Sequence, residues 1–461
     1  MSEAASDFKA AVVAESARAV ALGAYADFAA LHYLFLVNGG PYRLSYELDA
    51  ERSAQAVSGE VPLFAWDERE MAQERGVRFA DLPDSRPLRA KNGTMPEAVV
   101  AHGSGLMHFV VGPVHAGIIE PGRFTFSSGG ETVVHLDAQL GYSHRGVERA
   151  LEDMLAVDAA PLVARICGGC SASRSYAYAL ALEAIARSET PGDVDLARLV
   201  LGELERIYNH VADLAASASG AGWGAGFARG MALKEEAMRL CWVASGHRLL
   251  FDAIAPGGVV PHAVADRRLL TVEVSRLEER TARYLDAVFG NASLTSRWKG
   301  AGILSHETAR VFGALGPAHR ASRGKTDVRA FAPYGAYCQR PLRIAQAAGG
   351  DAFARCQVKR AELAESFRLI LEALGELGNA PLSPVVALDI GSGSAIGVVE
   401  GPRGAETVAL DVDAGRIKRL HVISASYRNW PLVAKAMDGN IVPDFPLVNK
   451  SFNLCYACVD R

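Results

Sequence analysis

The sequence predicts an α+β protein that is mainly helical, with small β-rich parts towards both ends of the chain. Between residues 136 and 250 apolar residues recur with helical spacing, most clearly in Glu203–Asp213. Residues 33–48 alternate around an Asn-Gly-Gly turn, which is typical of a β-hairpin. After Leu382, short β-branched runs separated by Gly or Asp indicate strands.

The first 95 residues are expected to form a separate N-terminal region. Residues 1–36 are rich in Ala with helical apolar spacing, so a helix running into the first strand of the hairpin is predicted. The polar stretch 66–88, which contains Pro and several Arg, is interpreted as a connector between domains. The domain boundary is placed near Met95.

Strands and then long helices are predicted for the middle of the chain. Residues 107–135 alternate in strand fashion, and Ser171–Arg187 reads as a largely buried helix. A Gly-rich patch at Gly220–Gly230 is expected to interrupt the helical part. Two further helices are predicted at residues 265–289 and 352–377.

The composition excludes several classes of protein. The 461 residues suffice for two or three domains. Half of the residues are apolar and 22% are charged, which is ordinary for a soluble globular protein. A net charge of −4 with mixed signs indicates no nucleic-acid partner. No apolar run reaches the roughly 18 residues of a membrane helix, and no signal peptide is evident. Seven cysteines in such a chain favour free thiols or metal ligands over disulfides.

Four of the cysteines form two CxxC pairs at distant positions. Cys167 and Cys170 lie 288 residues before Cys455 and Cys458, which excludes the compact spacing of zinc ribbons and zinc fingers. Thiolates are soft ligands, so a shared site could hold Zn, an iron–sulfur cluster or another soft transition metal. A thioredoxin-like motif is disfavoured, because the βαβ context is missing. The other three are interpreted as buried small apolar residues: Cys241, Cys338 and Cys356.

Five motifs carry a resemblance to a known family, and they occur in the family's order. They are Gly112–Gly122, Gly141–Glu148, Arg165–Cys170, Glu203–His210 and Pro446–Arg461. Together they resemble the large, catalytic subunit of membrane-bound, energy-converting nickel–iron hydrogenases of the formate hydrogenlyase type. That family is homologous to the quinone-site subunit of respiratory complex I.

The resemblance implies two domains and one fold. Residues 96–461 would form a hydrogenase large-subunit-like catalytic domain, with the helical body of the complex I 49 kDa subunit and small β-rich parts. Residues 1–95 would form a short α/β region similar to a shortened complex I 30 kDa domain.

The resemblance also implies a metal centre on the four cysteines. Cys167 and Cys455 would bind Ni terminally, and Cys170 and Cys458 would bridge Ni to an Fe that carries CO and cyanide ligands. The family further implies a Mg ion near the C-terminus.

Three residues match the family's residues around the centre. Arg403 matches an arginine that overhangs the metals, where a fixed charge in a dry pocket can polarise H₂. Glu120 matches a glutamate that relays protons beside a terminal thiolate. Asp213 matches an acidic residue near the same place more loosely. His115 and His144 resemble histidines of the complex I quinone region, although a hydrogen-bonded core or interface role is favoured for both.

The sequence departs from the family at three positions. Arg174 stands where most members have a histidine, so a permanent charge would act on the sulfur surroundings. Asn453-Leu454 replaces the Asp-Pro that precedes the last cysteine pair, so a carboxylate is lost. Gly169 stands where a bulkier apolar residue is common, which could open space over the site.

The implied function is reversible H₂ oxidation and proton reduction. The expected partners are an iron–sulfur small subunit and further iron–sulfur and antiporter-like membrane subunits, with the complex bound peripherally at the cytoplasmic side of the inner membrane. One alternative is a complex I-like quinone- or ferredoxin-linked oxidoreductase subunit with a modified or non-hydrogenase metal site. Another is a structural assembly subunit held together by Zn.

Overall fold

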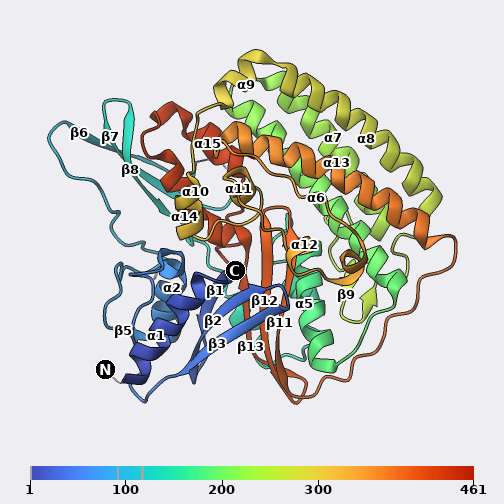
Figure 1. Ribbon diagram of the computed structural model, residues 1–461, viewed down its shortest axis with the longest axis horizontal. Coiled ribbons are helices and arrows are strands. Elements are labelled where there is room, and N and C mark those ends of the chain that lie inside the picture. The colour runs from blue at the N-terminus through green and yellow to red at the C-terminus, as the bar shows by residue number, and fades with distance from the viewer. Residues whose placement is uncertain (1–2, 91–92, 116–118) are drawn as a thin grey trace.

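The computed structural model describes residues 3–90, 93–115 and 119–461 (Figure 1). Within these ranges a large helical body is combined with three antiparallel sheets of three strands each and two small two-stranded sheets. The predicted mainly helical α+β class is confirmed.

The first sheet belongs to the N-terminal region and has the strand order β1-β2-β3 (Val20–Ala26, Ala30–Val37 and Gly40–Glu47). Val37 pairs with Gly40 across a two-residue turn, so the predicted hairpin is confirmed. The helix predicted for residues 1–36 is wrong beyond α1 (Glu3–Ser16), since β1 follows it. All but the first residue of β1 are buried, and this packing overrides the helical propensity of alanine.

The polar stretch 66–88, which was interpreted as a connector between domains, contains a packed helix. Residues Ala65–Arg75 form helix α2, which packs against β1. Its Asp67, Glu68 and Glu70 are buried and paired with residues from other parts of the chain. A polar sequence pattern therefore misled the prediction, because these charges face inwards.

The helical body is built from five long helices: α5 (Ser171–Ala186), α6 (Gly192–Gly220), α7 (Gly224–Ser245), α8 (Arg267–Gly290) and α13 (Ala352–Leu377). Helix α6 packs against both α7 and α13, and α8 covers those two helices (Figure 1). The Gly-rich interruption between α6 and α7 is limited to residues 221–223.

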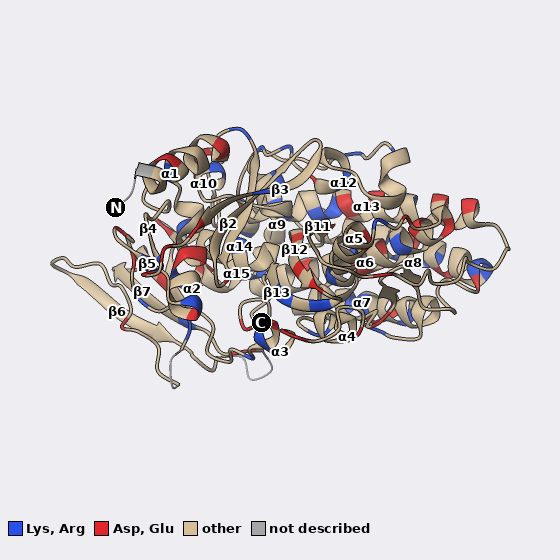
Figure 2. Ribbon diagram, turned by 90° about the horizontal axis from the view of Figure 1, so that it is seen from below, with Lys and Arg blue, Asp and Glu red and all other residues tan. Residues whose placement is uncertain are grey.

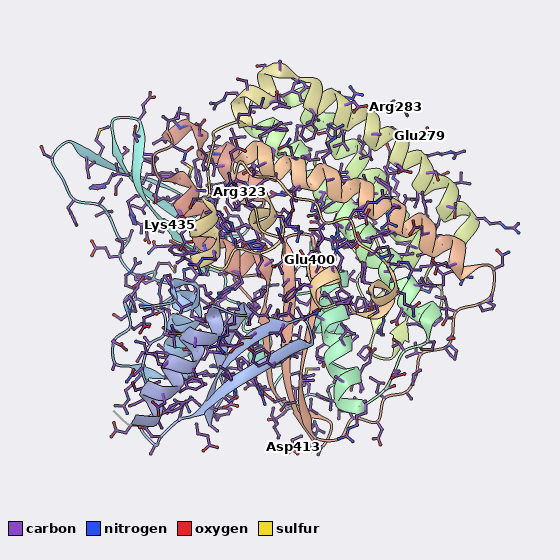
Figure 3. The ribbon with its side chains drawn as sticks, viewed as in Figure 1. Glu279, Arg283, Arg323, Glu400, Asp413 and Lys435 are labelled. Atoms are coloured by element: carbon purple, nitrogen blue, oxygen red, sulfur yellow. The ribbon has the colours of Figure 1, made fainter. Side chains whose placement is uncertain are left out.

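The second sheet, β11-β12-β13 (Gly393–Gly401, Gly404–Asp413 and Arg416–Ile423), lies between the N-terminal sheet and helix α5. Glycine is required at Gly397, because a Cβ there would lie 1.8 Å from Ala177 O of α5. On the other side, Gly23 of β1 packs against Ile423. In Figure 3, Glu400 near one end of the sheet lies in the middle of the molecule and Asp413 at its lower edge.

The third sheet, β6-β7-β8 (Leu106–Val111, Arg123–Gly129 and Thr132–Gln139), projects from the body and confirms the strands predicted for residues 107–135 (Figure 1). It packs against α14 (Ala425–Met437) and, through ring contacts of Phe445, against α15 (Phe445–Phe452). Residues 453–461, called the tail below, follow α15 and return to the middle of the chain, where they contact the loop before α5.

Short elements connect these parts. The helices are α3 (Val147–Ala150), α4 (Ala160–Ala164), α9 (Ala292–Trp298), α10 (His306–Val311), α11 (Gly316–Ala321) and α12 (Val328–Phe331), with 3-10 turns at Pro62–Phe64, Gly335–Gln339 and Val442–Asp444. The small strands are β4 (Ser53–Ala54), β5 (Arg78–Phe79), β9 (Ile254–Ala255) and β10 (Gly258–Val259). Figure 2 shows acidic and basic residues interspersed along the ribbon. Across the described residues, each helix falls short of the length and apolarity that crossing a membrane requires.

Candidate metal centre

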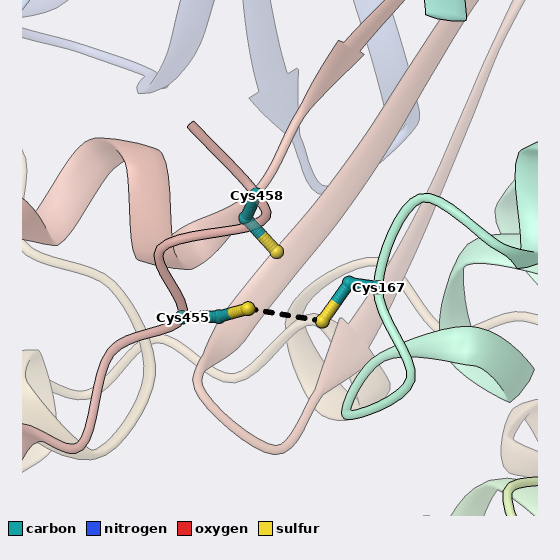
Figure 4. Close-up of side chains that lie close together, drawn as sticks. All are labelled: Cys167, Cys455 and Cys458. Carbon is teal, nitrogen blue, oxygen red and sulfur yellow. Dashed lines mark hydrogen bonds between the residues drawn. The ribbon is translucent and has the colours of Figure 1, made fainter. Parts of the chain in front are cut away.

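The two cysteine pairs meet inside the protein, and Figure 4 shows three of the four side chains: Cys167, Cys455 and Cys458. The Sγ atoms of Cys167 and Cys455 are 3.1 Å apart, and the Sγ atoms of Cys167, Cys455 and Cys458 all lie within 4.8 Å of one another. Cys170 is fully buried and packs in the same cluster. The fold thus brings the end of the chain back to the loop before α5, and four soft ligands converge on one place.

Helix α6 holds the first cysteine loop in position. The hydroxyl of Tyr208 donates to Gly168 O at 2.9 Å, and Asn209 Nδ2 donates to Gly169 O at the same distance. The Glu205 carboxylate accepts hydrogen bonds from the first backbone N–H groups of α5, at 2.7 Å from Ala172 N. A carboxylate is favourable at a helix N-terminus, so these contacts fix the start of the helix beside Cys170.

One arginine joins the two cysteine loops directly. Arg145 Nη2 donates to Ile166 O at 2.7 Å and to Ala457 O at 2.8 Å, which are the carbonyls immediately before Cys167 and Cys458. The tail is held further by α14, whose Ser426 Oγ accepts a hydrogen bond from Cys455 N. Both loops are therefore fixed through their backbones.

Arg174 lies on the Cys458 side of the cluster and is completely buried. Its Nη2 is 2.7 Å from Glu406 Oε2 and 3.3 Å from Cys458 Sγ. Hydrogen bonds from the other three thiols, together with the Arg174 charge, hold the pKa of Cys458 well below its usual value. Burial raises the pKa of Glu406 to about 7 against the lowering effect of Arg174. The departure from the family at this position thus supplies a fixed positive charge beside a cluster sulfur.

Arg403 extends from the turn between β11 and β12 into the same place and is buried. Its Nε donates to Asn453 O at 2.5 Å and its Nη1 to Asn209 Oδ1 at 2.9 Å. Burial opposes the charge, but Asp213 and the cysteine thiolates raise the pKa of Arg403 well above its usual value. The guanidinium is a permanent charge held beside the thiols.

Asp213 lies on α6 behind Arg403 and is completely buried. Its carboxylate is 3.6 Å from Arg403 Nη2 and 2.8 Å from Lys359 Nζ, and it accepts a hydrogen bond from Asn453 Nδ2. Burial alone would raise the pKa of Asp213, yet Lys359 and Arg403 lower it overall. The carboxylate therefore stays charged and orients Arg403.

A cavity of about 850 Å³ opens onto the thiols of Cys167 and Cys455. Glu120, which is half-buried, and Arg403 both line it, while most of its wall is apolar. His115 also lines the cavity, where burial lowers its pKa and its Nε2 is 3.4 Å from the Tyr456 hydroxyl. Residues 116–118 of the motif that contains His115 and Glu120 lie outside the described residues.

Other residues singled out from the sequence lie apart from the cluster. His144 is near Glu74, at 4.0 Å, in a separate charged cavity of about 230 Å³. Cys241 and Cys356 are buried as expected, but Cys338 is exposed, because it lies in a 3-10 turn and not inside a helix. Sequence reasoning assigned no role to four residues that support the cluster. Arg145 and Asn209 stand inside the motifs Gly141–Glu148 and Glu203–His210, which were the signal for them. Lys359 and Glu406 are single charges in the sequence, and no distinguishing pattern marks them.

The donor set fits the nickel–iron centre that the family implies. Four sulfurs converge, and three of them lie close enough together to share one metal. In addition, Arg174 Nε and Nη1 have no hydrogen-bond partner among the described residues although both are buried. Buried donors of this kind need a partner, which an anionic ligand at the centre can provide.

The Mg site implied near the C-terminus is a different case. Glu70, Glu148 and His421 offer ligand atoms within 4.8 Å of one another. The Arg461 guanidinium, however, lies 2.6 Å from Glu148 and 2.9 Å from Glu70, so a positive group of the protein already occupies the place of a cation. These residues do not fit a divalent metal.

Comparisons with known proteins agree with this geometry. The family described as respiratory-chain NADH dehydrogenase, 49 Kd subunit, matches residues 221–389. The chain is 28% identical over 445 residues to formate hydrogenlyase subunit 5 of Escherichia coli (strain K12), which covers 90% of this chain and 78% of that protein. It is 29% identical over 354 residues to the carbon monoxide-induced hydrogenase of Rhodospirillum rubrum, and the match covers 76% of this chain and 98% of that protein. The chain is a homologue of membrane-bound hydrogenase large subunits.

A solved structure shows the same fold for this hydrogenase homologue. A chain of the membrane-bound sulfane sulfur reductase, an archaeal respiratory membrane complex, superposes with a TM-score of 0.72 at 24% sequence identity. The match covers 77% of this chain and 99% of the other. The architecture is therefore one that occurs in membrane-bound respiratory complexes.

Proposed function

We propose that the chain is the catalytic subunit of a membrane-associated nickel–iron hydrogenase complex, an oxidoreductase that acts on H₂. The observation that carries the proposal is the convergence of Cys167, Cys170, Cys455 and Cys458 below the buried guanidinium of Arg403. The curated relatives support the same activity, since two of them are a formate hydrogenlyase subunit and a carbon monoxide-induced hydrogenase.

The protein's residues would divide the work at such a centre. Cys167, Cys170, Cys455 and Cys458 would hold the Ni and the Fe through their thiolates, with CO and cyanide as further ligands of the Fe. When bound, this centre supplies the heterolytic cleavage of H₂. Arg403 is a preorganised charge whose position costs no rearrangement during the reaction.

Proton transfer would use Glu120. This half-buried carboxylate lines the cavity that also contains Cys167 and Cys455, so it can exchange protons with a terminal thiolate and with the cavity. Asp213 does not face this route directly, because its oxygens bind Lys359, Asn453 and Arg403. Its proposed role is to orient Arg403.

The electron partner would be an iron–sulfur small subunit, because the four paired cysteines are committed to the proposed centre. Further iron–sulfur and antiporter-like membrane subunits would complete the assembly at the cytoplasmic side of the inner membrane. Relatives that form membrane-bound complexes support partner subunits in general.

The decisive experiment is metal analysis with infrared spectroscopy on the purified complex. One Ni per complex is expected, with one Fe at this site beyond the iron of the iron–sulfur clusters, together with CO and cyanide stretching bands. Cys455→Ser should abolish both the bands and H₂ activity, whereas Cys338→Ser, at an exposed cysteine away from the cluster, should change neither. Zn alone, or full activity in Cys455→Ser, would refute the proposal.

The size of the cavity favours one second candidate. About 850 Å³ of mostly apolar space far exceeds what H₂ requires and matches the size of sites for drug-sized ligands. A complex I-like subunit that binds a quinone beside a modified metal site would use this volume, and the match to the 49 Kd family supports it. A complex that lacks Ni and the CO and cyanide bands but reduces a quinone analogue would decide for this candidate.

A further inference from the structure

Arg461 is a fully buried arginine that joins three separate parts of the chain. Its Nε is 2.6 Å from Glu148 Oε1, on α3, and its Nη2 is 2.9 Å from both carboxylate oxygens of Glu70, on α2. Its guanidinium also lies over the ring of Tyr427, 4.6 Å from the centroid. A planar fork of donors suits this double carboxylate contact, and an ammonium group would not reproduce it.

A second arginine strengthens the same junction. Arg89 lies 3.0 Å from Glu70 through Nη2 and donates from Nε to Val459 O of the tail at 3.3 Å. Glu70 therefore lies between one arginine of the tail and one arginine that binds the tail backbone. Both contacts bind the N-terminal helix α2 to the segment that carries Cys455 and Cys458.

The negative charges of Glu70 and Glu148 are compensated by cationic side chains without a metal ion. Glu148 contacts Arg419 at 3.3 Å and His421 at 3.0 Å in addition to Arg461, and Glu70 contacts both Arg89 and Arg461. Two buried carboxylates thus face three guanidinium groups. A divalent cation would have to displace the Arg461 guanidinium and leave it buried without a partner, which is strongly unfavourable.

We propose that Arg461, Glu70 and Glu148 form a tail clamp, in which the guanidinium takes the position of a divalent cation. Arg461 and Glu70 are positioning residues: through them α2 fixes the tail, and with it the sulfur atoms of Cys455 and Cys458. The tail clamp goes beyond the proposed function, since it acts on the tail whatever metal the thiols bind.

Hydrogen–deuterium exchange of the full-length chain in its purified complex tests the tail clamp. The amides of Val459 and Asp460 are hydrogen-bonded to Tyr456 O, so they report on the tail. Glu70→Gln should accelerate their exchange about tenfold or more, because it leaves Arg461 and Arg89 short of a buried partner. The matched control is Glu68→Gln on the same helix, a buried carboxylate that accepts hydrogen bonds from the Tyr33 hydroxyl and Val57 N of the N-terminal region.

The results separate the tail clamp from general destabilisation. Faster tail exchange in Glu70→Gln with unchanged tail exchange in Glu68→Gln supports it, whereas equal effects in both variants, or none in either, would overturn it. Should Glu70→Gln fail to fold, Arg461→Lys keeps the charge without the fork and should give a smaller acceleration at the same amides.

A metal titration completes the test. When Mg²⁺ or Mn²⁺ is added to the wild-type complex, no stoichiometric binding that depends on Glu148 is expected. Stoichiometric binding that is lost in Glu148→Gln would show that a cation displaces Arg461 and would refute the tail clamp. Loss of the nickel–iron infrared bands is a separate readout, so failure of the proposed function is distinguishable from failure of the clamp.

Discussion

Asn453 Nδ2 donates a hydrogen bond to the buried carboxylate of Asp213, and this contact joins the tail to α6 directly beside Arg403. The same residue accepts a hydrogen bond from Arg403 Nε through its backbone carbonyl. The side-chain amide therefore completes a set of contacts in which Asp213 faces two cations, Lys359 and Arg403. A carboxylate at position 453, which the resemblance to the family implies for its other members, would add a second negative charge beside Lys359 and Arg403.

Asp213→Asn should strongly destabilise the protein and impair catalysis. It leaves Lys359 and Arg403 buried without their shared carboxylate, which costs roughly 3–5 kcal/mol of the free energy of unfolding. Arg403 would lose its orientation, so H₂ activity should fall as well. Urea unfolding and H₂ uptake measure the two effects.

The control for this variant is Asp286→Asn, at an exposed residue that pairs with Arg360 on the surface. Exposed pairs contribute little, so stability and activity should change by less than about 1 kcal/mol and twofold. Equal behaviour of the two variants would contradict the role assigned to Asp213.

The residues of the candidate site could be found from the sequence where they occur in compact motifs. The four cysteines, Glu120 and Arg403 each stand in a short segment that resembles one family, and the structure brings these segments together. Glu406 could not be found in this way. It is a single charge in a strand, and its partner Arg174 is 232 residues away in sequence.

The errors in the fold prediction have a related cause. Residues Val20–Ala26 are rich in alanine, and a helix is expected from their spacing. They form strand β1, which packs between α2 and β13, because burial of the segment outweighs the helical propensity of alanine. Asp67 and Glu70 made the α2 sequence resemble an exposed connector, although each pairs with an arginine from a distant part of the chain. Local periodicity contains no information about such partners.

Gly169 should tolerate one methyl group and no more. A Cβ there would lie 3.4 Å from Asn209 Oδ1, 3.6 Å from Arg403 Nη1 and 3.7 Å from Cys167 Sγ, which are ordinary contact distances. Gly169→Ala should therefore keep the H₂ oxidation rate within about twofold of the wild-type rate. Gly169→Val should displace Arg403 and lower the H₂ oxidation rate at least tenfold, which corresponds to about 1.4 kcal/mol in the activation barrier. A fully active Gly169→Val enzyme would show that the Arg403 position is not critical.

The stability of the protein should depend on pH through Asp67. Burial raises the pKa of this carboxyl to about 7 against the lowering effect of Arg428. The folded state binds the Asp67 proton more tightly than the unfolded chain does. The protonated carboxyl therefore makes its full contribution to the free energy of unfolding below about pH 4, and this contribution is lost as the pH rises through 7. The wild-type free energy of unfolding, relative to that of Asp67→Asn, should fall by a few kcal/mol between pH 5 and pH 8.

Urea unfolding of both proteins across this pH range measures the difference, in which the contributions of other groups cancel. Glu235, an exposed carboxylate paired with Arg248, provides the comparison, because Glu235→Gln should show no such slope between pH 5 and pH 8. A difference that stays constant with pH would mean that Asp67 is charged throughout.

Arg174→His should keep the metals but change the electronic state of the centre. The wild-type guanidinium places a permanent charge 3.3 Å from Cys458 Sγ, and a neutral imidazole would remove it. Loss of a positive charge makes reduction less favourable, so the reduction potential should fall by tens of millivolts and the CO and cyanide bands should move to lower frequency. Redox titration followed by infrared spectroscopy measures both.

Arg174→Lys separates this charge effect from geometry. In the wild type, Arg174 Nη2 contacts both Glu406 and Cys458. Lysine retains the positive charge but replaces the planar guanidinium with a compact ammonium group. Its potential should stay closer to the wild-type value than that of Arg174→His, even if less metal is incorporated. Identical bands and potentials in all three proteins would show that residue 174 stabilises the fold through Glu406 without influencing the centre.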